Sequence, residues 1–288
     1  YDHDKLEQAC DIPCNKVSRG MTACCDALDD IVAVMWEQDT GHMYTQAEAT
    51  EVLYCAAGKI REVSTEVSHT ERVTRPSGKL PGWGKIFEVC TGPNSNLGEA
   101  AKDFDGVKCV RITKDTDFSR KETVDELKDS IRANPGCSLH GSLPCTVWSI
   151  WQKMCIHRYG PKYEQRLARR RTNAVRMLNN FIDCAELCLS LGGEISFEWP
   201  RHCTGWARKE LISFIHRNNL YSAAVDGCAC GMTNKAGEPL LKQWRFVCSS
   251  QRQAVSLAAL RCQHPAGFRH GEISGSTTRL TEEYPISL

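Results

Sequence analysis

The sequence predicts an α/β fold: a mainly parallel sheet covered by helices on both faces, preceded by a helical region. From Lys85 onward, short apolar segments of strand length alternate with segments of helical periodicity. In residues 1–75 the apolar residues keep helical spacing, without strand-like alternation. Between these parts, residues 76–84 are rich in proline and glycine and form the predicted linker. We therefore expect a helical region at 1–75, a linker at 76–84 and an α/β domain at 85–288.

Each predicted strand is a short apolar run bounded by polar or turn-forming residues. The clearest helix lies between the third and fourth strands, where Pro161 stands near its start and Gly192 follows its end. The six expected strands are Lys85–Cys90, Val107–Ile112, Cys137–Leu143, Glu194–Trp199, Ala223–Gly227 and Trp244–Cys248.

Charge and cysteine content set limits on partners and compartment. With 36 basic and 35 acidic residues the net charge is +1, so a nucleic-acid-binding surface has to be local. No apolar run has the length of a membrane span and the sequence does not begin like a signal peptide, so we expect no membrane. The 17 cysteines in a chain of this size predict free thiols in a reducing, intracellular compartment, either nucleus or cytoplasm.

In open α/β sheets, ligands bind beyond the carboxyl ends of the strands. The turn after the first strand contains Glu88, Gly92 and Gly98, and a glycine there lets the backbone approach a ligand closely. Because G-x-G-x-x-G is missing, a cofactor without a pyrophosphate is favoured over a dinucleotide. An ordinary strand–turn–helix connection explains the same residues.

The second strand ends in Asp115 and Asp117, which are placed to accept hydrogen bonds from ribose hydroxyls. The alternative is that one of these aspartates caps the helix that follows.

The third strand is followed by Ser142, Pro144, Cys145 and Ser149. Proline fixes the backbone, so Cys145 is presented at the strand's end, where its thiolate would be a strong nucleophile. The alternative is one more core cysteine.

The fourth strand ends in Glu198, a carboxyl group in an otherwise apolar segment. A buried glutamate has to be paired or protonated, and a protonated one can donate to a ring nitrogen. The alternative is a structural ion pair with Arg201.

Together these segments resemble the class I S-adenosylmethionine-dependent methyltransferases, which have a Rossmann-like fold, and most closely the cytosine-C5 type. The family's motifs read roughly D-L-F-x-G-x-G-G, P-C-Q and E-N-V, where this chain has E-V-C-T-G-P-N-S, P-C-T and E-W-P. The chain is also similar to divergent methylase-like domains of phages and retroelement polyproteins. The departures are Thr146 for Gln and Trp199–Pro200 for Asn-Val, and the nearest counterpart of a Q-R-x-R motif is Lys242–Arg245.

The resemblance implies S-adenosylmethionine as cofactor and assigns a role to each motif. Cys145 would add to C6 of the pyrimidine and Glu198 would stabilise N3, with Pro144 and Ser149 in the same catalytic segments. The residues that would bind the cofactor are Glu88, Gly92, Pro93, Asn94, Gly98, Asp115, Asp117 and Ser142.

Two other functions fit the same residues. Ser142–Cys145 also resembles a degenerate S/D/N-P-P-Y/W tetrad of exocyclic-amine methyltransferases acting on N4-cytosine or N6-adenine, for which Cys145 is dispensable. A methylase-like domain without activity, serving a larger polyprotein as a binding module, would explain the motif departures.

A nucleic-acid partner, with DNA favoured over RNA, would meet a local basic run. Residues 158–176 hold seven Lys or Arg and one Glu, and Arg169, Arg170 and Arg171 are expected to contact phosphates together with Arg201. The alternative is a solvated helix face. Four tryptophans offer either stacking surfaces or core packing, namely Trp148, Trp151, Trp199 and Trp206.

For metals the main expectation is none. Cysteine and histidine near the end could gather as a structural zinc site, but neither C-x-C nor C-x-H has the spacing of a standard finger. The weak candidates are Cys228, Cys230, Cys262, His264 and His270.

Overall fold

The computed structural model describes residues 80–113, 115–273 and 281–288. The predicted helical region at 1–75 and the first part of the predicted linker lie outside these residues.

All six predicted strands are present in the described part of the chain, with ends shifted by one or two residues. They form one sheet in the order β2-β1-β3-β4-β6-β5. The bounds are β1 Lys85–Thr91, β2 Lys108–Thr113, β3 Ser138–Gly141, β4 Glu194–Pro200, β5 Tyr221–Asp226 and β6 Gln243–Cys248.

The sheet is only partly parallel. β2, β1, β3 and β4 run in the same direction, whereas β6 lies antiparallel between β4 and β5. The α/β class is confirmed, but the antiparallel β6 means that a Rossmann-like parallel sheet is not confirmed.

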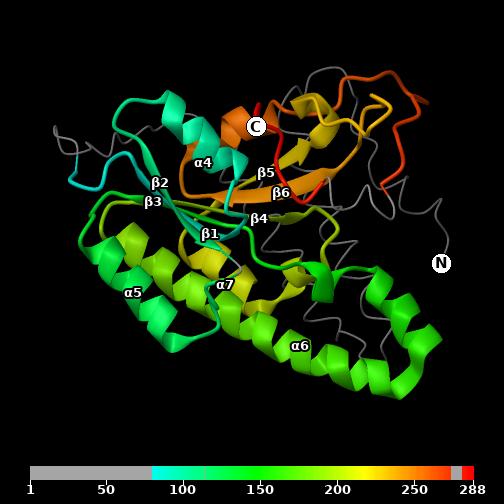
Figure 1. Ribbon diagram of the computed structural model, residues 1–288, viewed down its shortest axis with the longest axis horizontal. Coiled ribbons are helices and arrows are strands. Elements are labelled where there is room, and N and C mark those ends of the chain that lie inside the picture. The colour runs from blue at the N-terminus through cyan, green and yellow to red at the C-terminus, as the bar shows by residue number, and fades with distance from the viewer. Residues whose placement is uncertain (1–79, 114, 274–280) are drawn as a thin grey trace, which may run out of the picture. The chain divides into compact units, whose positions relative to one another are not determined.

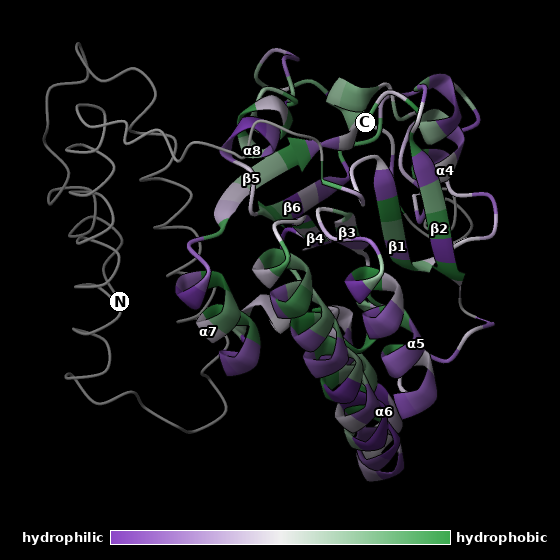
Figure 2. Ribbon diagram, turned by 90° about the vertical axis from the view of Figure 1, so that its left-hand side faces the viewer, coloured by the Kyte–Doolittle hydropathy of each residue, from purple (hydrophilic) through white to green (hydrophobic). Residues whose placement is uncertain are grey.

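Helices cover both faces of the sheet, as predicted. In Figures 1 and 2 the helices α5, α6 and α7 lie on one face, and α4 and α8 lie on the other. The bounds are α4 Asn96–Ala100, α5 Lys121–Arg132, α6 Trp151–Ser190, α7 Lys209–Arg217 and α8 Gln251–Ala258.

The longest helix, α6, contains the predicted helix between Pro161 and Gly192 and begins before it. Gly160 has a φ of 68° and interrupts the helix with a kink directly before Pro161, as expected where proline removes a backbone donor. Gly192 has a φ of 76°, the left-handed conformation typical of a residue after a helix end. None of the helices within the described residues is long and apolar enough to cross a membrane.

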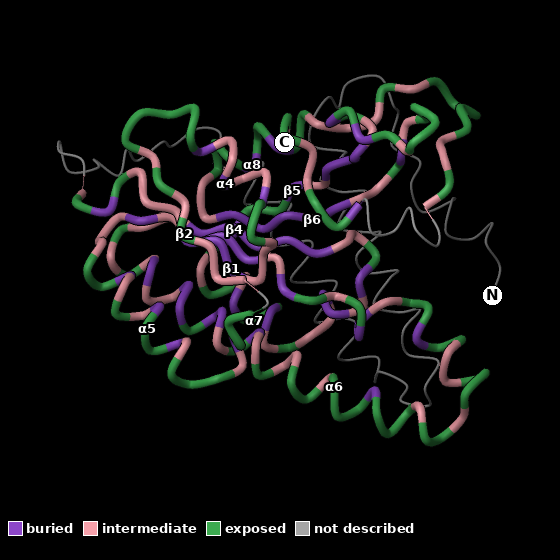
Figure 3. The backbone as a smooth tube through the Cα atoms, viewed as in Figure 1, coloured by how far each residue is buried: buried purple, intermediate pink, exposed green. Residues whose placement is uncertain are grey.

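The buried apolar side chains form two clusters. A row of buried polar side chains crosses neighbouring strands on one face of the sheet. The larger cluster joins the sheet to α5, α6 and α7, and the second joins β5 and β6 to α8. Figure 3 shows buried backbone concentrated in the strands. Glu88, His140 and Ser196 lie opposite one another on β1, β3 and β4, and each is buried. Buried parallel strands are normally apolar on both faces, so this polar row marks a site rather than a core.

Replacing Gly141 at the end of β3 by Ala should destabilise the protein. A β-carbon at this position would lie 2.4 Å from the ring of Phe181, which is fully buried and has no space to move. We expect a loss of about 1–3 kcal/mol in the free energy of unfolding, measured by urea titration. Gly92→Ala is the matched control, because the nearest atom to its β-carbon is Glu283 Oε1 at 3.8 Å. Equal stability of the two variants would contradict this packing.

Candidate active site

Glu198, near the end of β4, is the centre of the candidate site. Its side chain is 4% exposed, and its Oε2 accepts hydrogen bonds from the Ser142 hydroxyl at 3.0 Å and the Tyr284 hydroxyl at 2.7 Å. The other oxygen, Oε1, is buried and has no hydrogen-bond partner among the described residues. A buried polar atom without a partner costs free energy, so this oxygen has one hydrogen-bonding position left for a ligand or a water molecule.

The protonation of Glu198 follows from this environment. Burial raises the pKa of Glu198 to about 7, although the hydrogen bonds from Tyr284 and Ser142 act in the opposite direction. A large fraction of the carboxyl group is therefore protonated at neutral pH. Oε1 can then present a proton to a bound base, as the sequence predicted for this residue.

A hydrogen-bonded chain extends from Glu198 across the polar row of the sheet. The Tyr284 hydroxyl lies 3.3 Å from His140 Nε2, and the Ser196 hydroxyl lies 2.8 Å from His140 Nδ1. Burial lowers the pKa of His140 to about 4, so its imidazole is neutral. The chain therefore fixes the Tyr284 hydroxyl toward Glu198 without adding a charge to the site.

Tyr284 arrives from the carboxyl-terminal segment, residues 281–288. Its ring packs against Trp244 and Phe246 on β6, with ring centroids 5.7 and 6.0 Å away. Its carbonyl accepts a hydrogen bond of 2.6 Å from the Asn96 side chain at the start of α4. This segment therefore connects the turn after β1 to Glu198 on β4. The sequence indicated no role for Tyr284 or His140, and the only signal was the Tyr-Pro pair near the chain's end.

Cys145 lies in the loop that follows β3, at the same edge of the sheet as Glu198. Its side chain is half-buried, and its backbone carbonyl accepts a hydrogen bond of 2.8 Å from Trp148. Burial raises the pKa of the Cys145 thiol, and the negative charge of Glu198 raises that pKa further. Cys145 is thus a resting thiol, and a protonated Glu198 removes one of the two obstacles to forming the thiolate.

The backbone of the Cys145 loop is held from several sides. Leu143 accepts a 2.7 Å hydrogen bond from the Trp199 indole, and Val147 accepts a 3.1 Å bond from Arg171. The Ser149 hydroxyl accepts a 3.3 Å bond from the Trp151 N–H at the start of α6. Arg171 and Ser149 therefore support this loop through hydrogen bonds. Pro144 is exposed and Cys145 is half-buried.

The turn after β1 is shaped by Glu88. Its buried carboxylate accepts hydrogen bonds from the Thr91 hydroxyl at 2.8 Å and from the Ser95 hydroxyl. Cys90 has a φ of 62°, at a point where the pairing of β1 with β2 shifts register. A left-handed non-glycine residue at a bulge is strained, and such strain concentrates at functional sites. Nothing in the sequence indicated this conformation.

The two glycines of this turn have different surroundings. Gly92 is half-buried, a β-carbon on it would meet Glu283 Oε1 at an ordinary contact distance of 3.8 Å, and Pro93 and Asn94 next to it are exposed. A β-carbon on Gly98 would lie 2.1 Å from the Arg111 guanidinium, which packs over the start of α4. A side chain at Gly92 would therefore meet only an ordinary contact, whereas Gly98 is required for packing within the protein.

Asp115 and Asp117, after β2, are both exposed. Asp117 accepts hydrogen bonds from the backbone and hydroxyl of Ser119 at 2.9 and 2.7 Å, and these bonds lower its pKa. Asp117 thus stabilises a local turn before α5, which resembles the helix-capping role given above as the alternative. Asp115 remains accessible at the end of the same strand.

A cavity of about 650 Å³ lies elsewhere, over the polar face of the sheet between α4, α8 and residues 284–288. None of the residues predicted to bind a cofactor lines it. Because its walls come from the amino-terminal halves of β3 and β4 and from Tyr284, it lies beside the hydrogen-bonded chain, and Cys145 is not part of it.

The remaining predicted residues divide between surface and core. Arg169 and Arg170 are exposed on α6, and Arg201 is half-buried after β4. Trp151 is 62% exposed, whereas the other three predicted tryptophans are buried in the core: Trp148, Trp199 and Trp206. Four of the five candidate metal ligands form one cluster, namely Cys228, Cys262, His264 and His270, and buried Cys230 is not part of it.

No protein-family model, curated protein or solved structure matches this chain.

The coupling between Cys145 and Glu198 can be measured by alkylation. Glu198→Gln removes the negative charge beside the sulfur, so the thiolate fraction and the rate of iodoacetamide labelling at Cys145 should rise roughly three- to tenfold at pH 8. Mass spectrometry of the labelled peptides gives the rate. Half-buried Cys155 on α6 is the internal control and should label equally in both proteins. Unchanged labelling of Cys145 would contradict the proximity of these two groups.

Proposed function

We propose that this protein is an S-adenosylmethionine-dependent nucleic-acid methyltransferase that acts on cytosine C5 through Cys145. The observation that carries the proposal is the buried Oε1 of Glu198, without a hydrogen-bond partner and beside a half-buried cysteine. C5 of cytosine is not nucleophilic until a nucleophile has added to C6. A cysteine and a protonated carboxyl group on one side of a base are the two groups that this addition needs.

The order of the strands supports the class of enzyme. Class I methyltransferases combine parallel strands with one reversed strand near an edge of the sheet, and β6 has that position and direction. In the cytosine-C5 type the P-C and Glu motifs follow neighbouring strands. Here the corresponding residues follow or end β3 and β4, which pair directly.

The turn after β1 fits the cofactor in one testable respect. Glu283 Oε1 is the only atom within 4 Å of a β-carbon built on Gly92, among the described residues, and Asp115 lies accessible after the neighbouring strand. S-adenosylmethionine, when bound, supplies an electrophilic methyl group on a sulfonium. The backbone at Gly92 and the carboxyl group of Asp115, as a hydrogen-bond acceptor, would contact the nucleoside part of the cofactor.

The residues then act in a defined sequence. The Cys145 thiol would give its proton to water, and its sulfur would then bond to C6 while the proton on Glu198 Oε1 passes to N3; the π electrons of the C5–C6 bond move into a C4–C5 double bond, which makes C5 nucleophilic. Once C5 carries the methyl group that the cofactor would supply, water would take the C5 proton, the bond from Cys145 sulfur to C6 would break, and the N3 proton would return to Glu198, which restores the ring. The hydrogen bonds from Ser142 and Tyr284 stabilise the carboxylate that Glu198 becomes during the addition.

A base can reach this site only outside the helical stack. Exposed Trp151 begins α6 directly after the Cys145 loop, and exposed Arg169 and Arg170 lie further along the same helix. An aromatic face and cations near the loop suit a single-stranded or extruded nucleotide. We take DNA as the substrate, following the resemblance to DNA methyltransferases.

Methylation of an exocyclic amine is the second candidate, and the raised pKa of Cys145 favours it. Amine methylation needs no thiolate, only acceptors that orient the amino group. Oxygen atoms of the Ser142–Cys145 segment would supply them.

Cofactor binding should respond to the size of residue 92. Gly92→Val adds an isopropyl group beside a backbone that the cofactor would approach, so S-adenosylhomocysteine affinity measured by calorimetry should fall at least about tenfold. Gly92→Ala should show a smaller loss. Equal affinity in wild type and Gly92→Val would place the cofactor elsewhere.

A trapped covalent intermediate separates the two chemical mechanisms. With DNA containing 5-fluorocytosine the final elimination is blocked, so the wild-type protein should form an adduct that survives denaturing electrophoresis. Cys145→Ala should form none. Glu198→Gln should form it at least about 100-fold more slowly, because the amide cannot deliver a proton.

Cys155→Ala is the control and should form the adduct at the wild-type rate. Turnover that persists in Cys145→Ala would replace the C5 mechanism by amine methylation. If no folded variant or wild-type protein methylates nucleic acid, the protein is a binding module.

A further inference from the structure

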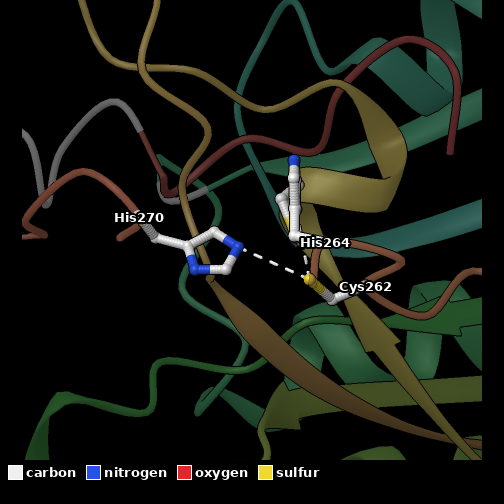
Figure 4. A group of neighbouring side chains, drawn as sticks. Cys262, His264 and His270 are labelled. Atoms are coloured by element: carbon white, nitrogen blue, oxygen red, sulfur yellow. Dashed lines mark hydrogen bonds between the residues drawn. The ribbon is translucent and has the colours of Figure 1, made fainter. Parts of the chain in front are cut away.

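A second cluster of reactive side chains lies outside the candidate active site, where β5 ends. The ligand atoms of Cys228, Cys262, His264 and His270 all lie within 4.8 Å of one another, and all four side chains are half-buried. Cys228 belongs to the turn Gly227–Cys230 after β5, and the other three follow α8. Figure 4 shows both histidine rings directed at the Cys262 sulfur.

We propose that these four side chains bind a structural zinc ion. The Cys262 sulfur lies 3.2 Å from His264 Nδ1 and 3.4 Å from His270 Nε2. Ligand atoms about 2.0–2.3 Å from a tetrahedral zinc lie roughly 3.3–3.8 Å from one another. The two separations from the Cys262 sulfur to the histidines are close to those that zinc imposes, and the other ligand atoms, all within 4.8 Å of one another, would have to shift by up to about 1 Å to complete the tetrahedron.

The donor set selects the metal. Two thiols and two imidazoles form the Cys₂His₂ set typical of structural zinc, whereas magnesium and calcium prefer oxygen ligands. All four positions of the tetrahedron are filled by protein atoms, so no site remains for a substrate or a reactive water. The ion would therefore stabilise the fold and take no part in chemistry.

Surrounding contacts hold the ligands in place. Asp226, buried at the end of β5, accepts hydrogen bonds from the Cys262 N–H at 2.9 Å and from Arg261 Nε at 3.0 Å. The ring of Phe268 stacks on His264, with centroids 4.0 Å apart. Such outer contacts orient metal ligands and shield them from water.

The cluster joins two segments that the hydrogen bonds of Asp226 to Arg261 and Cys262 already bring together. It would connect the turn after β5 to residues 262–270, and the same turn holds residues 281–288 because the Ser287 hydroxyl donates a 2.6 Å hydrogen bond to the Cys230 carbonyl. Tyr284, which reaches Glu198, lies in that segment. Zinc would therefore stabilise the support on which Tyr284 depends. The proposal holds whether or not the protein is a methyltransferase.

The test compares cysteine variants of the full chain, each purified under reducing conditions with added zinc. Wild type should retain about one zinc per chain at this site, measured by mass spectrometry of the metal after gel filtration. Cys228→Ala and Cys262→Ala should each lose that zinc. Cys230→Ala, two residues from Cys228 and outside the cluster, should keep it.

Cobalt substitution gives an independent readout on the wild-type protein, should the cysteine variants fail to fold. Bound cobalt should show tetrahedral ligand-field bands and a thiolate charge-transfer band with the intensity of two thiolates. Equal metal content in Cys228→Ala and Cys230→Ala would overturn the proposal. So would a cobalt spectrum without two thiolates, or a Cys228–Cys262 disulfide in the reduced protein.

Discussion

A single buried carboxyl group organises the candidate site. Among the described residues no cation lies within hydrogen-bond distance of Glu198, so this carboxyl group depends on hydrogen bonds from Ser142 and Tyr284 and on its own protonation. Each donor comes from a different part of the chain, one from the loop after β3 and one from the end of the sequence. The loop, the sheet and residues 281–288 therefore have to be in place together before the charge on this group is tolerated.

The sheet provides the frame for this arrangement because its parallel strands end at one edge. β1, β3 and β4 bring the Glu88 turn, the Cys145 loop and Glu198 to neighbouring positions. The antiparallel β6 then carries the chain back toward the amino-terminal ends of the parallel strands, and Tyr284 packs against Trp244 and Phe246 on β6. Phe246 on β6 pairs with Glu198 on β4 and contacts the ring of Tyr284. Tyr284 therefore reaches Glu198 by packing against β6, although it belongs to no strand of the sheet.

Local patterns in the sequence were sufficient for the strands, for most of α6 and for placing Cys145 and Glu198 at the ends of neighbouring strands, because each depends on periodicity or on where a strand ends. The direction of β6 was not predictable in this way, since it depends on partners distant in sequence. The contacts of Tyr284 and His140 are equally non-local. Ser149 and Arg171 were predicted to act on substrate, but their hydrogen bonds support the loop, a distinction that composition and spacing do not contain.

The position of Tyr284 also has a consequence for the order in which the molecule folds. Its hydrogen bonds join residues separated by 188 positions to Asn96, 144 to His140 and 86 to Glu198. Closing such long loops costs chain entropy that only the completed sheet can repay, so these contacts form late and open first. We therefore expect that a state with an intact sheet and a detached Tyr284 lies above the native state by less free energy than global unfolding. In that state Glu198 is open to water, and its acidity returns toward that of a free glutamate.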